Sequence, residues 1–118
     1  MSRVAREAWG RWAESVAAWS LRLRGYRIVA RRFRTPLGEI DLIARRGRLV
    51  AFVEVKARGD FIRAADALGS RQFGRVARAA SLYLAHHPHY AAHSVRFDAV
   101  LVGGLWPRHL PDVWRPPE

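Results

Sequence analysis

The spacing of hydrophobic positions along the chain begins with a helical pattern. Residues 3–24 place apolar and small side chains at intervals of three and four, which predicts an amphipathic helix. The predicted buried face consists of Trp9, Trp12, Ala13, Val16, Ser20 and Leu23. Gly25 follows, in the position where glycine commonly ends a helix. Glu14 lies off the centre of this face, beside the small residues Gly10 and Ala17.

Three strand-like segments come next, at residues 26–34, 38–45 and 49–56. The second alternates between apolar and polar positions. The third is almost continuously apolar until its end, which is typical of a central strand covered on both faces. Arg46 and Gly47 supply a turn between the last two strands, so these are expected to pair as an antiparallel hairpin.

A second helix is predicted at about residues 70–86, after a loop at about 57–69, with Ser70 as its N-cap. Its predicted buried face consists of Phe73, Val76, Ala77, Ala80 and Leu84. Residues 94–102 alternate like a strand, and residues 110–114 suit a short edge strand that Pro111 interrupts.

The order αβββαβ indicates an α/β fold in which helices pack on a mixed sheet. The length of 118 residues suits one domain, with a core at about 3–102 and a C-terminal tail at about 103–118. No cysteine is present, which excludes disulfides and thiolate metal sites. No apolar run reaches the length of a membrane span, and the start lacks the apolar segment of a signal peptide, so a cytoplasmic location without membrane contact is expected.

The net charge is +11, which favours a polyanionic partner such as a nucleic acid. Among 21 lysines and arginines, only Lys56 is lysine. Lysine is a compact point charge whose pKa can be lowered, whereas arginine is always charged and presents a planar fork. A position that stays lysine in such an arginine-rich chain indicates a chemical requirement that arginine does not meet.

Lys56 stands close in sequence to two carboxylates, Asp41 and Glu54. Side chains alternate along a strand, so Glu54 and Lys56 share a face. If the paired residue numbers of the hairpin sum to an odd value, Asp41 points to that face as well. A register slip of one residue would separate the carboxylates. The alternative interpretation is a solvent-facing pair of acids with Lys56 as their salt-bridge partner. Against it, Glu54 lies within the most hydrophobic strand, directly after Ala51, Phe52 and Val53, where an unpaired charge is unfavourable.

Several segments together resemble the YraN family, an uncharacterised bacterial family of the restriction-endonuclease-like, PD-(D/E)xK superfamily that is similar to Holliday junction resolvases. These segments are Gly10-x-x-Ala13-Glu14, Gly25-Tyr26-x-Ile28, Gly38-Glu39-Ile40-Asp41-Leu42-Ile43-Ala44, Phe52-Val53-Glu54-Val55-Lys56-x-Arg58 and Arg96-Phe97-Asp98. The resemblance implies a restriction-endonuclease-like αβββαβ core and a catalytic site at Glu14, Asp41, Glu54 and Lys56. It also implies a Mg²⁺ or Mn²⁺ ion on Asp41, Glu54 and the backbone carbonyl of Val55.

Two positions depart from the pattern of that family. The family usually has Lys-Gln at the start of the second helix, where this chain has Arg71 and Gln72. It commonly has asparagine before the aromatic residue of the first strand, where this chain has Arg32 before Phe33. Arg71 keeps the positive charge of the lysine, and Arg32 places a positive charge where the family has a neutral side chain.

Candidate contacts to nucleic acid come mainly from arginines, whose planar forks suit phosphate oxygens. The candidates are Arg31, Arg32, Arg34, Arg58, Arg71, Gln72, Arg75 and Arg78. A charged helix face that is simply solvated is the alternative. Trp9 and Trp12 suit packing in the core or in a homodimer better than base stacking. The nearby histidines His86, His87 and His89 lack the further converging ligands that a zinc site requires.

The sequence thus favours a Mg²⁺-dependent nuclease acting on structured DNA. A nucleic-acid-binding module that keeps the fold without turnover is the main alternative. A protein whose basic surface docks on an acidic partner is a third.

Overall fold

The computed structural model describes residues 2–59 and 67–117. The elements are α1 (Arg3–Leu23), β1 (Arg27–Thr35), β2 (Gly38–Arg46), β3 (Leu49–Ala57), α3 (Ala67–Ala85), the 3₁₀ turn η1 (Pro88–Tyr90), β4 (Ser94–Val102) and β5 (Arg108–Trp114). The predicted order αβββαβ is confirmed, and the edge strand that follows it is longer than expected. Part of the predicted loop at 57–69 lies outside the described residues.

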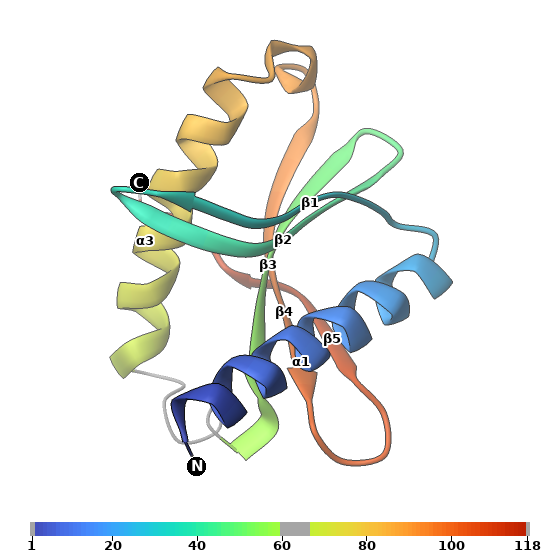
Figure 1. Ribbon diagram of the computed structural model, residues 1–118. Helices are drawn as coiled ribbons and strands as arrows, with labels where there is room; N and C mark the ends of the chain where they lie inside the picture. Colours follow the sequence, from blue (N-terminus) through green and yellow to red (C-terminus); the bar gives the residue numbers. More distant parts are fainter. Residues whose placement is uncertain (1, 60–66, 118) are drawn as a thin grey trace.

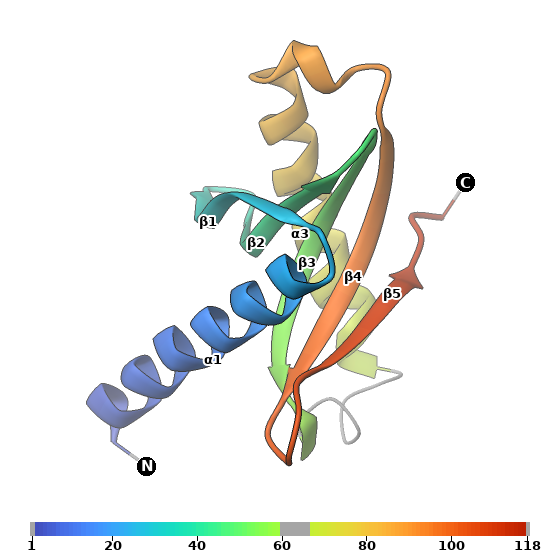
Figure 2. The same cartoon turned by 90° about the vertical axis from the view of Figure 1, so that its right-hand side faces the viewer.

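The five strands form one mixed sheet in the order β1-β2-β3-β4-β5 (Figure 1). β3 and β4 are parallel, and the other neighbouring strands are antiparallel. Two parallel neighbours need a crossover connection, and α3 lies within it. Helix α1 covers one face of the sheet and α3 covers the other, so a separate hydrophobic core lies on each face (Figures 1 and 2).

The buried face of α1 differs from the predicted one. The buried residues are Ala13, Ala17, Ala18, Ser20 and Leu21. Trp12 is 54% exposed and Leu23 is 66% exposed, although both were expected inside. The prediction weighed hydrophobicity above size, whereas close packing of the helix on the sheet is made here mainly by alanines, whose short side chains allow the two backbones to approach.

Helix α3 also departs from its predicted limits, because it begins at Ala67. Residue 70 lies inside the helix, so the prediction of Ser70 as its N-cap is wrong. The fully buried residues are Phe73, Val76, Ala79, Ala80 and Tyr83, with Ala77 and Leu84 partly buried. The predicted face is therefore rotated slightly, so that Tyr83 packs edge-on against Phe33 of β1.

A close approach between β2 and α3 fixes where that helix lies over the sheet. A Cβ atom added to Gly38 would stand 2.3 Å from the backbone oxygen of Arg75, far inside van der Waals contact. Only glycine leaves room for this approach. The contact brings the segment of α3 around Gln72 and Arg75 next to the start of β2.

β5 forms an edge of the sheet and includes Pro111, which was expected to interrupt it. Proline has no N–H to donate, and a sheet edge tolerates this loss when the missing donor would face solvent. The pairing of β4 with β5 shifts register between Phe97 and Ala99. No helix within residues 2–59 and 67–117 is long and apolar enough to cross a membrane.

Candidate functional site

The β2–β3 hairpin has the register parity that places the two carboxylates together. Leu42 pairs with Val53 and Ile43 with Phe52, so paired numbers sum to an odd value, which is the condition under which Asp41 was expected to share the face of Glu54 and Lys56. Regular pairing ends at Leu42 and Val53. Asp41 therefore stands at the point where β2 and β3 separate.

At that point the Asp41 side chain accepts a hydrogen bond in place of a backbone acceptor of the sheet. Its Oδ2 accepts a 2.8 Å hydrogen bond from the backbone N–H of Val55. The carboxylate thus satisfies a donor of β3 that would otherwise lack its strand partner. This bond holds Asp41 against the strand that carries Glu54 and Lys56.

Glu54 is the most enclosed of the candidate residues, with 6% of its surface exposed. Its Oε1 lies 3.4 Å from Lys56 Nζ and accepts a short hydrogen bond from Gln72 Nε2 on α3. Glu54 therefore faces α3, and the structure joins it to Lys56, as the alternation along β3 predicted. The contact with Gln72 was not foreseen, because Gln72 was considered as a contact to nucleic acid and not as a partner of Glu54.

These groups line a small cleft between the sheet and α3, with a volume of about 60 Å³. Its lining residues are Glu39, Asp41, Glu54, Gln72, Arg75 and Val76. Of the eight candidates for nucleic-acid contact, Gln72 and Arg75 thus lie at the acidic site. The cleft combines three carboxylates, an amide and a guanidinium, which are groups that bind cations, water and phosphate.

Both carboxylates hold their protons unusually tightly. Burial raises the pKa of Glu54 to about 8, and the charge of Asp41 adds to the rise, while Lys56 opposes it. Burial also raises the pKa of Asp41 to about 6, against the hydrogen bond from Val55 and with further repulsion from Glu14. Two acids that repel one another in a cleft would both ionise readily only if more positive charge were added. Such strongly shifted groups are typical of functional sites.

Glu14 approaches the site from α1 but is held by another residue. Its Oε1 accepts a 2.6 Å hydrogen bond from Arg32 Nε, and its side chain is 12% exposed. Its charge acts on Asp41, so the two are neighbours. Within the described part of the chain, no group of three or more acidic, histidine or cysteine residues is arranged to hold a metal ion. The direct or water-bridged metal role expected for Glu14 stays a prediction.

Arg32 has a backbone φ of 53°, in the left-handed region. Asparagine tolerates this conformation better than most residues. In this chain the backbone strain is accompanied by the ion pair with Glu14.

The other candidate arginines are spread over the surface. Arg71, Arg75 and Arg78 are exposed on α3. Arg31 Nη2 donates to Ser15 Oγ of α1 over 3.1 Å, and Arg34 pairs with Glu39 at 3.7 Å. Arg58 points elsewhere and donates from Nη2 to the backbone oxygen of Trp106, over 3.4 Å.

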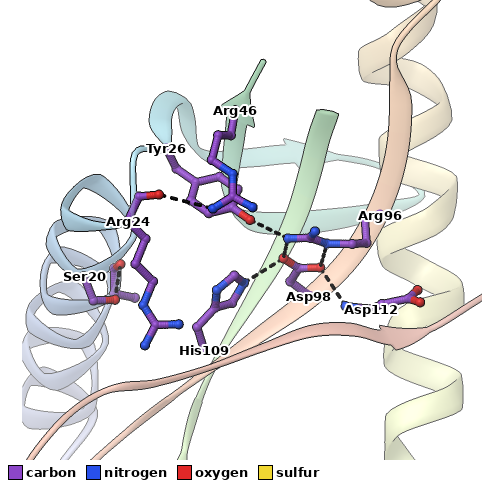
Figure 3. Close-up of polar contacts among 9 residues, drawn as sticks. Ser20, Arg24, Tyr26, Arg46, Arg96, Asp98, His109 and Asp112 are labelled. Atoms are coloured by element: carbon purple, nitrogen blue, oxygen red, sulfur yellow. Dashed lines mark hydrogen bonds and ion pairs between the residues drawn. The ribbon is translucent and has the colours of Figure 1, made fainter. Parts of the chain in front are cut away.

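A second polar cluster lies on the α1 face of the sheet, built around Asp98 (Figure 3). Asp98 is fully buried and accepts two 2.7 Å hydrogen bonds from Arg96, in a fork. His109 Nε2 lies 2.7 Å from Oδ2, and the backbone N–H of Asp112 donates to Oδ1 over 3.0 Å. Arg96 Nη2 also donates to the hydroxyl of Tyr26 over 2.6 Å. The sequence contained one signal for this cluster, an arginine and an aspartate two residues apart on one strand, but no function was assigned to it.

Together these features define a class: a mixed α/β protein with a pair of acids, one buried and one partly buried, and one lysine at the open end of a central hairpin. Comparison with known proteins then places the chain in a family. Residues 13–102 match the model of the Uncharacterised protein family UPF0102, and the chain belongs to that family. The resemblance to the YraN family is thereby confirmed.

Relatives cover nearly the whole chain. A UPF0102 protein of Parvibaculum lavamentivorans is 58% identical over 105 residues, covering 88% of this chain and 79% of the relative. One of Rhodopseudomonas palustris is 51% identical over 112 residues, with 94% and 86% covered. One of Maricaulis maris is 48% identical over 124 residues, with 98% and 94% covered.

Proposed function

We propose that the protein is a divalent-metal-dependent phosphodiesterase that cleaves structured DNA at the cleft between β3 and α3. The observation that carries the proposal is the meeting of the partly buried Asp41 and the buried Glu54, both with raised pKa values, beside the single lysine of a strongly basic chain. A protein that only needed a stable core would gain nothing from repulsion at this place.

The donor set fits a magnesium or manganese ion. Both metals prefer oxygen ligands, and two carboxylates with a strand carbonyl are an ordinary set for them. Asp41, Glu54 and the carbonyl of Val55 would hold the ion. When bound, such an ion neutralises charge on a phosphate and lowers the pKa of a water molecule. Repulsion between Asp41 and Glu54 favours binding of a cation at this point.

The remaining side chains then have separate roles. Lys56 orients the attacking water and stabilises the negative charge that develops on the phosphate. Gln72 holds Glu54 in place through its hydrogen bond. Arg75 lies at the same cleft and binds a phosphate oxygen of the substrate, while the exposed Arg71 and Arg78 follow the DNA backbone on the same helix.

A DNA-binding module without turnover is the second candidate. It is favoured by the contacts of Glu54, whose Oε1 already meets both Gln72 and Lys56. In that case the acidic pair serves only to shape the cleft, and a metal ion gives no cleavage.

A cleavage panel distinguishes the two candidates. Linear duplex, single-stranded, flap and four-way-junction DNA are each incubated with the wild-type protein, with and without Mg²⁺ or Mn²⁺. We expect cleavage of at least one branched substrate, only with the metal. Cleavage of no substrate, together with no Mn²⁺ binding by calorimetry, would reject the enzyme and leave the binding module.

Two variants test the residues. Asp41→Asn keeps an oxygen that can accept the bond from Val55, so it should fold, retain DNA affinity and lose metal binding and cleavage. Lys56→Arg keeps the charge but changes its shape and basicity, and should lose at least about 100-fold in cleavage rate. An active Lys56→Arg enzyme would remove the assigned role of the lysine.

A further inference from the structure

The loop between β4 and β5 carries the most exposed large apolar side chain of the described structure. Leu105 is 96% exposed, and the neighbouring Trp106 is 71% exposed. The loop follows Gly103 and Gly104, whose φ values of 114° and 87° are unfavourable for other residues. Two exposed apolar residues on a glycine-built turn form a definite feature, here called the Leu105–Trp106 tip.

The tip stands at the end of the sheet where the acidic site lies. In the parallel pair of β3 and β4, Lys56 aligns with Leu101 and Ala57 with Val102, so β4 ends beside the end of β3. The turn between β4 and β5 projects beyond that end in both views of the molecule (Figures 1 and 2). The tip therefore extends from the sheet only a few residues along from Lys56.

Arg58, which directly follows β3, contacts the tip. Its Nη2 donates to the backbone oxygen of Trp106 over 3.4 Å. Its guanidinium packs on Gly104, within 3.6 Å of where a Cβ atom would stand. The arginine that follows Lys56 by two residues thus positions an apolar turn next to the candidate site, which separates it from the other arginines considered for phosphate contact.

The charge around the tip indicates what it contacts. Residues 99–111 contain no aspartate or glutamate, and Arg58 and Arg108 flank the turn. Two side chains cover far less than the roughly 800 Å² that each partner contributes to a stable protein interface. Their size does suit one base or one base step, against which exposed aromatic and leucine side chains stack or insert.

We propose that the Leu105–Trp106 tip stacks on an unpaired base at a DNA branch point and so directs the neighbouring acidic site to branched DNA. This inference rests on the proposed function for its consequence, since it names the substrate feature that the same site would meet. The stacking itself does not need turnover, so it can be tested by binding alone.

The test uses the full chain in EDTA, which prevents metal-dependent cleavage. The probe is a forked DNA with 2-aminopurine at its first unpaired position, compared with a linear duplex of the same length. Wild-type protein should quench the 2-aminopurine and prefer the fork. Trp106→Ala should weaken fork binding about tenfold and abolish the quenching, with duplex affinity unchanged. Because stacking is not ionic, the lost preference should be similar at every salt concentration.

Two further variants provide the controls. Trp106→Phe keeps an aromatic ring and should retain most of the preference for the fork. Trp19→Ala removes a tryptophan on α1 that is 51% exposed, and should change neither affinity. Equal loss on fork and duplex, or an unchanged fork affinity in Trp106→Ala, would overturn the proposal. The proposal would also be overturned if the protein bound anionic lipid vesicles, the Trp106→Ala variant lost this binding, and its fork affinity stayed unchanged. That result would assign the tip to a membrane surface.

The two proposals fail in different ways. A protein that binds forks through Trp106 but cleaves nothing with Mg²⁺ or Mn²⁺ would reject the nuclease and keep the tip. A protein that cleaves, and whose Trp106→Ala variant keeps its preference among substrates, would reject the tip alone.

Discussion

Two acidic sites lie on opposite faces of one sheet, and the pKa values of their carboxylates are shifted in opposite directions. On the α1 face, burial raises the pKa of Asp98, but hydrogen bonds from His109 and Arg96 outweigh it and hold the pKa below its usual value. On the α3 face, burial and the charge of Asp41 raise the pKa of Glu54 to about 8, and burial with repulsion from Glu14 raises that of Asp41 to about 6.

The difference between Asp98 and Glu54 lies in the partners rather than in the depth of burial, since both side chains are buried. Asp98 receives bonds from a forked guanidinium, an imidazole and a backbone N–H. Glu54 has Lys56 and Gln72 but faces a second acid. A buried charge that receives all its hydrogen bonds from the chain itself has a role in the fold. A pair of acids that is incompletely neutralised is suited to binding a ligand. The following variants test that distinction.

The largest expected effect is the loss of the charge at Asp98. Asp98→Asn leaves Arg96 without its counter-charge and turns an amide donor toward existing donors. The free energy of unfolding should fall by about 3–5 kcal/mol, measured by urea denaturation at pH 7 without divalent ions. Glu7→Gln is the control, because it changes an exposed carboxylate outside the cluster and should leave the stability nearly unchanged. A loss below about 1 kcal/mol for Asp98→Asn would show that the cluster is dispensable.

The opposite sign is expected for Glu54→Gln. The unfolded glutamate ionises near its ordinary pKa of 4.5, whereas the folded one keeps its proton until about pH 8. The unfolded state therefore binds fewer protons between these values, and the stability of the wild type falls as pH rises through that window. Removing the charge should raise the free energy of unfolding by about 2 kcal/mol at pH 8.5 and hardly at pH 5.

Urea denaturation at the two pH values, without divalent ions, measures this change. Glu7→Gln, at an exposed position of α1, serves as the control and should show no such pH dependence. If the Glu54→Gln protein were less stable than the wild type at pH 8.5, the charge of Glu54 would stabilise the folded state, as that of Asp98 is expected to do.

The next largest effect on stability is expected from a divalent ion, which should bind at the α3-face site only. At ten times its dissociation constant, Mn²⁺ should stabilise the wild type by about 1.4 kcal/mol at pH 8, seen as a higher melting temperature. The effect should shrink at pH 5, because the carboxylates must lose their protons to bind the ion. It should vanish in Glu54→Gln. An undiminished effect in that variant would locate the ion elsewhere.

The smallest expected effect concerns the edge of the Asp98 cluster. Tyr26→Phe removes the hydroxyl that accepts a bond from Arg96, while the two bonds from Arg96 to Asp98 remain. The cost should be about 1 kcal/mol in urea denaturation, with the response to Mn²⁺ unchanged. A loss as large as that of Asp98→Asn would mean that the tyrosine, and not the aspartate, holds the cluster together.

Local rules explain what the sequence could predict. The hairpin of β2 and β3 and its parity follow from side-chain alternation and one turn, so Asp41, Glu54 and Lys56 could be expected near one another. The contact of Gln72 with Glu54 depends on where α3 rests, which is fixed by the close approach at Gly38. The packing of α1 was missed because alanines, rather than tryptophans, form most of its contact with the sheet.

The Asp98 cluster was missed for another reason. Its members come from β4, β5 and the end of the α1–β1 connection, and they meet only in the folded protein. The pattern along β4 shows an arginine and an aspartate on the same face. It does not show that the arginine also donates a hydrogen bond to a tyrosine 70 residues earlier.

The parallel pairing of β3 with β4 also has a consequence for the order in which the site is assembled. The two acids belong to a hairpin whose residues are neighbours in sequence, and contacts of that kind close early in folding. Gln72 and Arg75 reach the acids only when α3 docks within the crossover between β3 and β4, and such long-range closure comes late. Without α3 in place, the two acids would be open to water and would regain ordinary proton affinity. The unusual protonation of the site is therefore a property of the last docking step, and each local opening of α3 would briefly remove it.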